Sequence, residues 1–528
     1  MTAPTPSTTA PSPSADGSGV VRAGRLVRQM FRRGPAQRTL HLTWFAFFLT
    51  FVVWFNFAPF ATTIGKEFGL SKGQLVTLGL CNLALTVPAR LVIGGLLDRF
   101  GPRRTFSAIL VYAIVPCILF ATANSFGMLV VSRLMIGVVG AGFVVGIRMV
   151  SEWFPPRQLG TAEGLYGGWG NFGAAAATLC LPIVADTIGG PDGWRWAAAL
   201  TGVAACLYGL AYSRLVDDTP GGVPYVRARK AAALEVTGRP AVWGLIAMSV
   251  PLAGALGVIA WRIWYVDVIS SAVLAVAIAA AIVLLGVQVL AVWKVNVRAR
   301  ANAVPTDEQY PFRSVAVLSL AYMCTFGSEL AAVSFLPEFF EHTWGLSTTV
   351  AGAAASTFAI MNLVSRPAGG LFSDVLRSRR RWLALLLVGL GAGYLVASRL
   401  SDAWPLALAI ATVLGVSLFA QAGNGAVYAI VPLIKKPVSG QIAGLAGAYG
   451  NVGGIVFLTS LLFLSPQGVF LLMGAMSIVV FLATRWLVEP ASSHADDDAL
   501  RDAIATGAVP VGAGASRGGL DLATAGRA

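Results

Sequence analysis

Two related stretches decide the fold of this chain. Residues 90–104 read RLVIGGLLDRFGPRR, and residues 366–380 read RPAGGLFSDVLRSRR. In both, an arginine precedes an aspartate by eight residues, which is about two turns of a helix, and further arginines follow. This pattern is typical of a helix that carries a charge inside a membrane and then leaves the membrane at a basic loop.

A second pair of stretches supports the repeat. Residues 164–173 read GLYGGWGNFG and residues 444–453 read GLAGAYGNVG, with six of ten positions identical. The first pair is separated by 276 residues and the second by 280, so the chain has two related halves. Paired halves are how many transporters build a site that is reached alternately from the two sides of a membrane.

The composition identifies a membrane protein. Of the 528 residues, 56% are hydrophobic and 12% are charged, and the mean hydropathy is +0.74. Soluble globular chains carry roughly 25% charged residues, so an ordinary soluble enzyme, a secreted disulfide scaffold and a disordered protein are all excluded. Because apolar stretches of about 20 residues recur along the chain, we expect an all-α polytopic bundle and not a barrel.

We expect fourteen membrane helices, six in each half and two additional ones between the halves. The even number of additional helices leaves the orientation of the second half unchanged. The predicted spans are 40–63, 74–97, 105–124, 127–150, 161–185, 194–214, 242–260, 264–293, 314–338, 348–372, 382–400, 403–432, 440–463 and 467–487.

Basic residues predict the orientation. With the N-terminus in the cytoplasm, the inside segments hold 29 Lys and Arg and the outside loops hold five. The positive-inside rule therefore places both termini in the cytoplasm. We expect a multi-pass protein of the plasma or inner membrane that acts as a monomer in the lipid bilayer.

Five parts follow from this reading. Residues 1–39 form a disordered, basic cytoplasmic tail with no apolar core for a signal peptide. Residues 40–214 form the first six-helix half, and residues 215–312 form a linker with two extra transmembrane helices. Residues 313–487 form the second half, and residues 488–528 form a cytoplasmic tail.

Nothing in the sequence points to an enzyme or a receptor. The five cysteines lie in apolar stretches without a C-x-x-C pair, and the three histidines are scattered, so we expect no metal site, no cofactor and no disulfide framework. No phosphate loop or catalytic cluster is present. The net charge of +14 resides mainly in loops, so we expect no nucleic-acid partner.

Arg90 and Arg366 are the candidate binding residues. An arginine inside a bilayer costs about 2.5 to 3.5 kcal/mol on insertion scales, so it usually lines a cavity. Two arginines at repeat-related positions favour a small anion, because each guanidinium is a flat fork that matches two oxygens of a planar oxyanion. Asn171 and Asn451 add amide groups, although glycines and amides in such segments also serve simply to pack helices.

The loop at 94–104 resembles the loop 2–3 signature of the major facilitator superfamily, and residues 370–380 resemble its weaker copy. The resemblance implies the two-half fold of that superfamily and a gate at this loop. We assign the gate to Asp98, Arg99, Arg103 and Asp374. The alternative is that these charges only set the topology of the chain.

The segments at 164–173 and 444–453 resemble the paired nitrate signatures of the nitrate/nitrite porter family of that superfamily. The resemblance covers residues 40–214 and 313–487. It implies that Arg90 and Arg366 hold nitrate or nitrite, with four signature residues nearby: Gly170, Asn171, Gly450 and Asn451.

Span 314–338 contains a segment, residues 322–331, that also resembles this family. We expect the hydroxyl of Tyr322 to donate to the anion and the ring of Phe326 to lie against its plane, with plain packing as the alternative for Phe326. Asn424 is a further candidate amide in the cavity.

Import of an anion needs a driving force. Entry into an inside-negative cell costs about 2.3 kcal/mol per charge for each 100 mV. Glu329 is the one carboxylate that we place deep in a core span, and an acidic residue there resembles the proton-coupled branch of the family. Arginine neighbours favour its charged form and burial its neutral form, so it is the candidate proton site, unless it is fixed in an ion pair.

The sequence is therefore compatible with three candidate functions. Proton-coupled nitrate import ranks first, and nitrate/nitrite antiport ranks second. A drug/proton antiporter on the same fold ranks third, because a cationic substrate calls for buried acids and not for two buried arginines.

Overall fold

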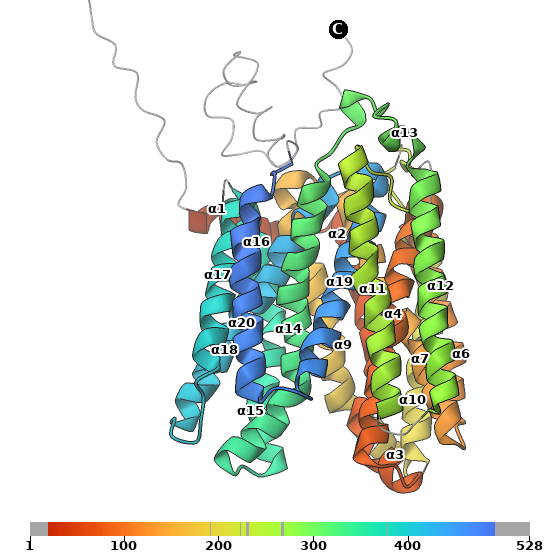
Figure 1. Cartoon of the computed structure of the whole chain (residues 1–528), viewed down its shortest axis with the longest axis vertical. Coiled ribbons are helices and arrows are strands. Elements are labelled where there is room, and N and C mark those ends of the chain that lie inside the picture. The colour runs from red at the N-terminus through yellow and green to blue at the C-terminus, as the bar shows by residue number, and fades with distance from the viewer. Residues whose placement is uncertain are drawn as a thin grey trace, which may run out of the picture.

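The computed structural model describes residues 19–190, 192–221, 223–228, 232–265, 269–376 and 378–490. Within these ranges every regular element is a helix, and the long helices run side by side in one bundle (Figure 1). Residues 1–18 and 491–528 of the expected tails lie outside the described residues, as does Arg377, so disorder at the two ends stays a prediction. The described part of the N-terminal tail, predicted as disordered up to residue 39, instead contains a helix over residues 19–30 and the start of the first membrane helix at Pro35.

The first half contains six membrane-crossing segments after a short amphipathic helix, α1. Glycine or proline breaks several of the segments into two helices. The helices are α1 (Gly19–Met30), α2 (Pro35–Trp54), α3 (Ala61–Glu67), α4 (Lys72–Phe100), α5 (Pro102–Tyr112), α6 (Ile114–Ala121), α7 (Phe126–Val139), α8 (Gly142–Trp153), α9 (Pro156–Ile188) and α10 (Gly193–Leu215).

Two long helices and one short helix lead from the first half to the second. These are α11 (Arg239–Tyr265), α12 (Ser271–Val295) and α13 (Val297–Arg300). The second half then contains α14 (Phe312–Trp344), α15 (Thr348–Ile360), α16 (Asn362–Val375), α17 (Arg379–Ala397), α18 (Leu406–Tyr428), α19 (Ser439–Ser460) and α20 (Pro466–Ala483).

The expected all-helical bundle of two six-helix halves and two additional helices is confirmed, although several spans predicted as single helices are broken into two. Thirteen helices in the described part are long and apolar enough to cross a membrane. In the second half, the span predicted at 348–372 is instead α15 followed by α16, which meet at Met361. Pro367 follows this break, and it removes one helical hydrogen bond from α16.

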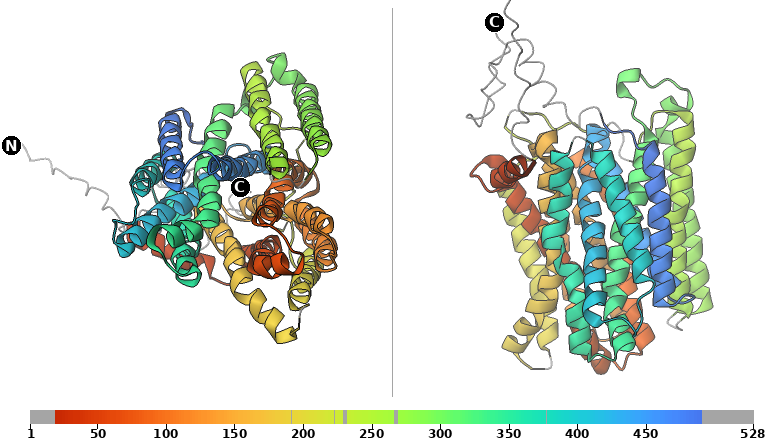
Figure 2. Two further views of the ribbon diagram at one scale, coloured as in Figure 1. Left: turned by 60° about the horizontal axis from the view of Figure 1, so that its bottom comes forward. Right: turned by 90° about the vertical axis from the view of Figure 1, so that its left-hand side faces the viewer.

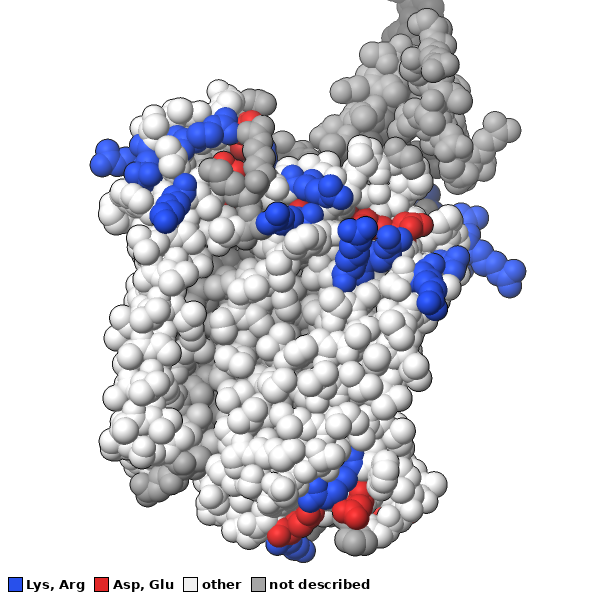
Figure 3. Space-filling view, turned by 90° about the vertical axis from the view of Figure 1, so that its right-hand side faces the viewer, with Lys and Arg blue, Asp and Glu red and all other residues white. Residues whose placement is uncertain are grey.

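Charged side chains lie at the two ends of the bundle, and the band between them is almost free of them (Figure 3). Lys and Arg gather mainly at one end, which carries the loops around Arg103, Arg313 and Lys436; we call it the basic end. The opposite end carries a smaller, mixed cluster that includes Lys66, Glu67 and Arg195. The wide apolar band is the surface that a bilayer requires.

The two halves contact each other through exchanged pairs of helices. Helix α9 of the first half packs along α16 of the second, and α19 of the second half packs along α4 of the first. A Cβ at Gly164 would lie 2.8 Å from the carbonyl oxygen of Arg366, and a Cβ at Gly444 would lie even closer to the carbonyl oxygen of Arg90. The repeated glycines therefore bring each signature helix against the backbone of the arginine helix from the other half.

The two additional helices stand at one side of the bundle (Figure 2). Helix α11 packs against α4 and α19, and the Tyr449 hydroxyl donates to the carbonyl oxygen of Met248 at 2.8 Å. Helix α12 packs chiefly on α11 and exposes apolar side chains such as Val276 and Ile282. The insert therefore packs against the outside of the core. It does not take part in the contacts of α9 with α16 or of α4 with α19.

The structure predicts that the insert is separable from the core. Removing residues 239–295 and joining the ends by a flexible linker deletes two spans, so a reporter at the C-terminus should stay on the side where it lies in the intact chain. As a matched control, removing residues 271–295 alone deletes one span, and the reporter should change sides. A reporter that changes sides in the first deletion would contradict the two-span insert.

Candidate functional site

Arg90 and Arg366 converge at the centre of the bundle. Arg90 is 0% exposed and Arg366 is 1% exposed. Their guanidinium carbons lie 5.6 and 5.1 Å from the centre of one ring, that of Phe143 on α8. The predicted pair of arginines is thus brought together around an aromatic ring that sequence reasoning did not single out.

Parallel aromatic rings form one wall beside the arginines. Tyr322 lies parallel to Phe143 at 6.2 Å and to Phe326 at 5.0 Å between ring centres, and the edge of Tyr428 meets both Phe143 and Tyr322. The ring of Phe326 also lies 5.5 Å from the Arg90 guanidinium. Aromatic faces stabilise buried cations without neutralising them, so the positive charge stays available.

Few protein acceptors bind the two guanidinium groups. Arg90 donates from Nη1 to the carbonyl oxygen of Gly447, and Arg366 donates from Nη2 to the hydroxyl of Tyr322 at 3.3 Å. In the part of the chain that the structure describes, Nε and Nη2 of Arg90 and Nη1 of Arg366 have no hydrogen-bond partner. Two buried cations with spare donors form a site that is complementary to an anion.

The signature asparagines differ from each other. Asn451 is fully buried, and neither its amide oxygen nor its amide nitrogen has a partner among the described residues. Asn171 donates to the side-chain oxygen of Asn362 at 3.5 Å. Asn451 therefore has both of its groups free for a ligand, whereas Asn171 is partly engaged.

The two signature glycines serve close packing in this structure. A Cβ at Gly450 would lie 2.7 Å from the ring of Tyr322 and 2.9 Å from that of Phe326. A Cβ at Gly170 would collide with the ring of Phe47. Gly450 thus borders the aromatic wall, whereas Gly170 fits α9 against α2.

Glu329 lies in a cage of amides. It is 6% exposed, and its two oxygens accept hydrogen bonds from Asn362 at 2.5 Å and Asn424 at 2.6 Å. Asn424, expected as a substrate amide, therefore binds Glu329 in this structure. Asn362 was not predicted, and it links Glu329 to Asn171.

Glu163 corrects the expectation that Glu329 is the one carboxylate deep in a core span. Glu163 on α9 is 2% exposed, and neither of its oxygens has a hydrogen bond or an ion pair in the described ranges. The predicted membrane span begins at residue 161, so Glu163 was expected at the end of the span and not inside it. Helix α9 instead begins at Pro156, so Glu163 lies two turns inside the helix.

The repeated aspartates close the basic end of the bundle. Asp98 accepts hydrogen bonds from the backbone of Gly440 at 3.0 Å and Gln441 at 2.8 Å, at the start of α19. Asp374 accepts from the backbone of Gly160 at 2.9 Å and Thr161 at 2.6 Å, near the start of α9. Each aspartate therefore binds the N-terminal turns of a helix from the other half, where the helix dipole favours a negative charge.

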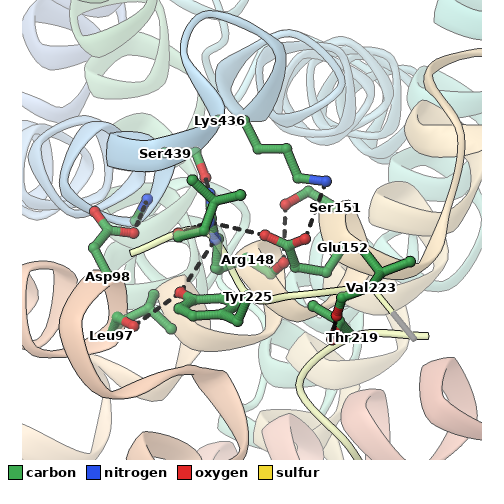
Figure 4. A network of polar contacts seen from close by, with 12 residues as sticks. Leu97, Asp98, Arg148, Ser151, Glu152, Thr219, Val223, Tyr225, Lys436 and Ser439 are labelled. Carbon is green, nitrogen blue, oxygen red and sulfur yellow. Dashed lines mark hydrogen bonds and ion pairs between the residues drawn. The ribbon is translucent and has the colours of Figure 1, made fainter. Parts of the chain in front are cut away.

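An ion-pair network reinforces the Asp98 contact (Figure 4). Arg148 pairs with Glu152 at 2.8 Å, and Lys436 of the second half pairs with the same carboxylate at 3.0 Å. Arg148 also donates to the hydroxyl of Ser439 at 2.5 Å and to the hydroxyl of Tyr225 at 3.3 Å, so the linker after α10 joins the network. At the Asp374 contact, Arg379 performs the matching role, because it pairs with Asp374 at 2.9 Å.

The other two predicted gate residues lie away from the contact between the halves. Arg99 is exposed and its guanidinium lies over the ring of Phe100. Arg103 pairs with Asp217 at 3.2 Å, and its backbone nitrogen donates to Asp218 at 2.7 Å. Arg103 thus joins the linker after α10 to the first turn of α5.

The residues that sequence reasoning missed fall into two groups. Charged ones such as Glu163, Arg148 and Arg379 were visible as rare charges in or beside apolar spans. Aromatic ones such as Phe143 and Tyr428 gave no signal, because an aromatic residue in an apolar helix is usually a packing residue.

Comparison with known proteins places these features in context. The Major Facilitator Superfamily model matches residues 43–305 and 318–518. The chain is 46% identical over 515 residues to the nitrate/nitrite transporter NrtP of Picosynechococcus sp., covering 89% of this chain and 96% of that protein. It is 48% identical over 481 residues to the NrtP of Nostoc punctiforme, with the same two coverages of 89% and 96%.

Among solved structures, the proton:xylose symporter XylE superposes with a TM-score of 0.59 at 14% identity, covering 87% of this chain and 97% of that one. At this identity the likeness concerns the fold alone.

The geometry predicts that the two arginines act as planar forks. Arg90→Lys and Arg366→Lys keep the charge but lose the paired donors, so each should weaken nitrate binding by more than about 1.4 kcal/mol, which is a tenfold effect. Binding is measured by titration of the purified protein with nitrate. Arg133→Lys is the matched control, because Arg133 is equally buried but donates to Asn56 and Trp54. Near-native affinity in both test variants would contradict the arrangement.

Proposed function

Because the chain belongs to the nitrate/nitrite porter family of the major facilitator superfamily, we propose that it carries nitrate and nitrite by alternating access, with nitrate import coupled to protons. The chain is a multi-pass membrane transporter and not an enzyme. The observation that carries the proposal is the pair of buried arginines with spare donors.

The chemistry of the arginine pair supports a planar monovalent oxyanion. Nitrate and nitrite offer oxygens in one plane, and each guanidinium fork matches two of them. The rings of Phe143 and Phe326 are flat surfaces beside the guanidinium groups. A drug/proton antiporter is disfavoured, because an organic cation would be repelled by two arginines in a low-dielectric site.

The two aspartate contacts support alternating access. Asp98 and Arg90 lie on α4, and Asp374 and Arg366 lie on α16, two turns apart in each case. Breaking both contacts would separate α19 from α4 and α9 from α16 at the basic end. The anion site lies between these helices, so opening there would expose the site to that side of the membrane.

The orientation follows from the charges. We place the basic end, with both termini, in the cytoplasm of a cell with an inside-negative plasma or inner membrane. The structure then has its cytoplasmic gate closed. Nitrate entering from outside works against the membrane potential, by about 2.3 kcal/mol per 100 mV, so import requires a cotransported cation or an exchanged anion.

Glu329 is the proposed proton carrier for symport. It interacts with the charge of Arg366, which also faces the anion site. An anion that binds Arg366 weakens the attraction between Arg366 and Glu329, so the carboxylate then binds a proton more readily. Nitrate and a proton would thus enter the closed site together.

Nitrate/nitrite exchange is the second candidate, and one observation favours it. Both oxygens of Glu329 accept amide hydrogen bonds, from Asn362 and Asn424, and these donors stabilise the charged carboxylate. A permanently charged Glu329 would leave exchange of one anion for another as the way to drive uptake.

The gate predicts a change of accessibility. Asp98→Asn and Asp374→Asn remove charge-assisted hydrogen bonds worth about 1.5 to 3 kcal/mol each, so the double variant should open the basic end more often. A cysteine at Ala446, in a background without the native cysteines, should react at least threefold faster with an impermeant thiol reagent applied from the cytoplasmic side. Asp192→Asn, in an exposed loop at the opposite end, is the control. Unchanged reactivity in the double variant would contradict the gate.

Glu329→Gln separates symport from exchange. The amide cannot titrate, so accumulation of labelled nitrate driven by a pH gradient should vanish in proteoliposomes, while counterflow against internal nitrate persists. Glu338→Gln, on the same helix but exposed, should behave like the unaltered protein. Accumulation retained in Glu329→Gln would move the proton site elsewhere. An unaltered protein that responds to internal nitrite and not to the pH gradient would favour exchange.

A further inference from the structure

Glu163 has no role in the transport scheme above, although it lies beside the anion site. Its helix, α9, packs along α16, and three positions on the same face of α9 identify its neighbours. Gly160 donates its backbone N–H to Asp374, whereas Gly164 and Gly167 lie against the backbone and side chain of Arg366. Glu163 therefore lies between the gate and the arginine, one turn from each.

Glu163 is surrounded by few groups that could stabilise its charged form in the closed structure, and among the described residues Arg366 is the one cation that acts on it. On α16, its charge interacts with those of Arg366 and Asp374, and Asp374 is itself paired with Arg379. Glu163 also interacts with the hydroxyls of Tyr428 on α18 and of Tyr166 on its own helix. Toward α2 and α8, this part of α9 meets the apolar rings of Phe47 and Phe143.

None of these groups donates a hydrogen bond to Glu163 in the described ranges. A buried carboxylate without a donor or an ion pair is far more stable with its proton than without it.

Packing does not explain a carboxylate at this position. The repeat that aligns Gly164 with Gly444 aligns Glu163 with Ala443, which is buried at the matching place on α19. The fold thus accepts a methyl group there. The difference also makes the two arginines unequal, because Arg366 interacts with the carboxylates of Glu163 and Glu329, whereas the groups that act on Arg90 are tyrosines and Arg366.

We propose that Glu163 is a proton-binding site on the cytoplasmic side of the arginine pair, and that its ionised form competes with the transported anion for Arg366. With the gate closed, Glu163 carries a proton and leaves Arg366 free for the anion. When Asp374 separates from Gly160 and Thr161, water reaches Glu163 one turn further in, and the carboxyl group releases its proton to the cytoplasm. The new negative charge beside Arg366 then weakens the hold on nitrate and promotes its release.

This inference rests on the proposed function, and it predicts a pH effect on one side of the membrane. Raising the cytoplasmic pH increases the ionised fraction of Glu163 while the gate is open. The KM for nitrate on the cytoplasmic side should therefore rise at least tenfold, whereas a change of external pH should leave this KM unaltered. The KM is measured by counterflow of labelled nitrate, which needs no proton gradient. The pH effect can therefore be tested whether or not protons drive net uptake.

The experiment uses membrane vesicles of known orientation that contain the full chain. In Glu163→Gln, the cytoplasmic KM should stay at the low-pH value of the unaltered protein at every pH. Glu163→Ala, which copies the residue of the second half, should behave in the same way, and it provides a second variant if the glutamine variant folds poorly. Glu308→Gln, in the loop before α14, is the control and should keep the pH effect.

Three results would overturn the inference. One is a pH-dependent cytoplasmic KM in both Glu163 variants, and another is loss of counterflow in both variants when each is folded and still binds nitrate. The third is an unaltered protein with active counterflow whose KM ignores the cytoplasmic pH. An unaltered protein without nitrate counterflow would instead overturn the proposed function itself.

Discussion

The burial of two arginines between the halves is the constraint on which the rest of the structure depends. Each side chain costs several kcal/mol to place in an apolar bundle unless it finds partners. Arg90 finds the carbonyl oxygen of Gly447 and two ring faces, and Arg366 finds the hydroxyl of Tyr322 and the ring of Phe143. These partners hold the cations in position without adding a counter-charge at hydrogen-bond distance. The positive charge of the two guanidinium groups is therefore not neutralised by the protein, and a small anion can neutralise it.

The same helices carry the anion site and its closure. Helices α4 and α16 each present an arginine at mid-depth and an aspartate at the basic end, and each packs on a glycine-rich helix of the opposite half. Because helix backbones are stiff over two turns, a separation at the aspartates changes the spacing at the arginines. The linker after α10 adds to this closure, since Tyr225 contacts Arg148 and the backbone N–H of Ala228 donates to the carbonyl oxygen of Asp98.

The halves are related but chemically unequal. Glycines, arginines, aspartates and signature asparagines repeat, and they build the frame. The two buried glutamates beside the site do not repeat: Glu163 corresponds to Ala443, and Glu329 lies in an amide cage on α14 of the second half alone. A symmetric frame suits a carrier that must open to either side of the membrane. Binding a proton on one side and releasing it on the other requires titratable groups that differ between the two sides. The carboxylates around Arg366 provide one.

The sequence by itself determined the membrane class, the two-half repeat, the two additional helices and the arginine pair, because these follow from hydropathy, spacing and the cost of a charge in an apolar span. Tertiary structure decided which side chains meet. It joined both guanidinium groups to the ring of Phe143, directed Asn424 to Glu329, and placed Glu163 inside the bundle by starting α9 at Pro156. Such contacts arise between helices hundreds of residues apart. No periodicity within one helix can specify them, since rotation and depth against the opposite half are fixed only by packing.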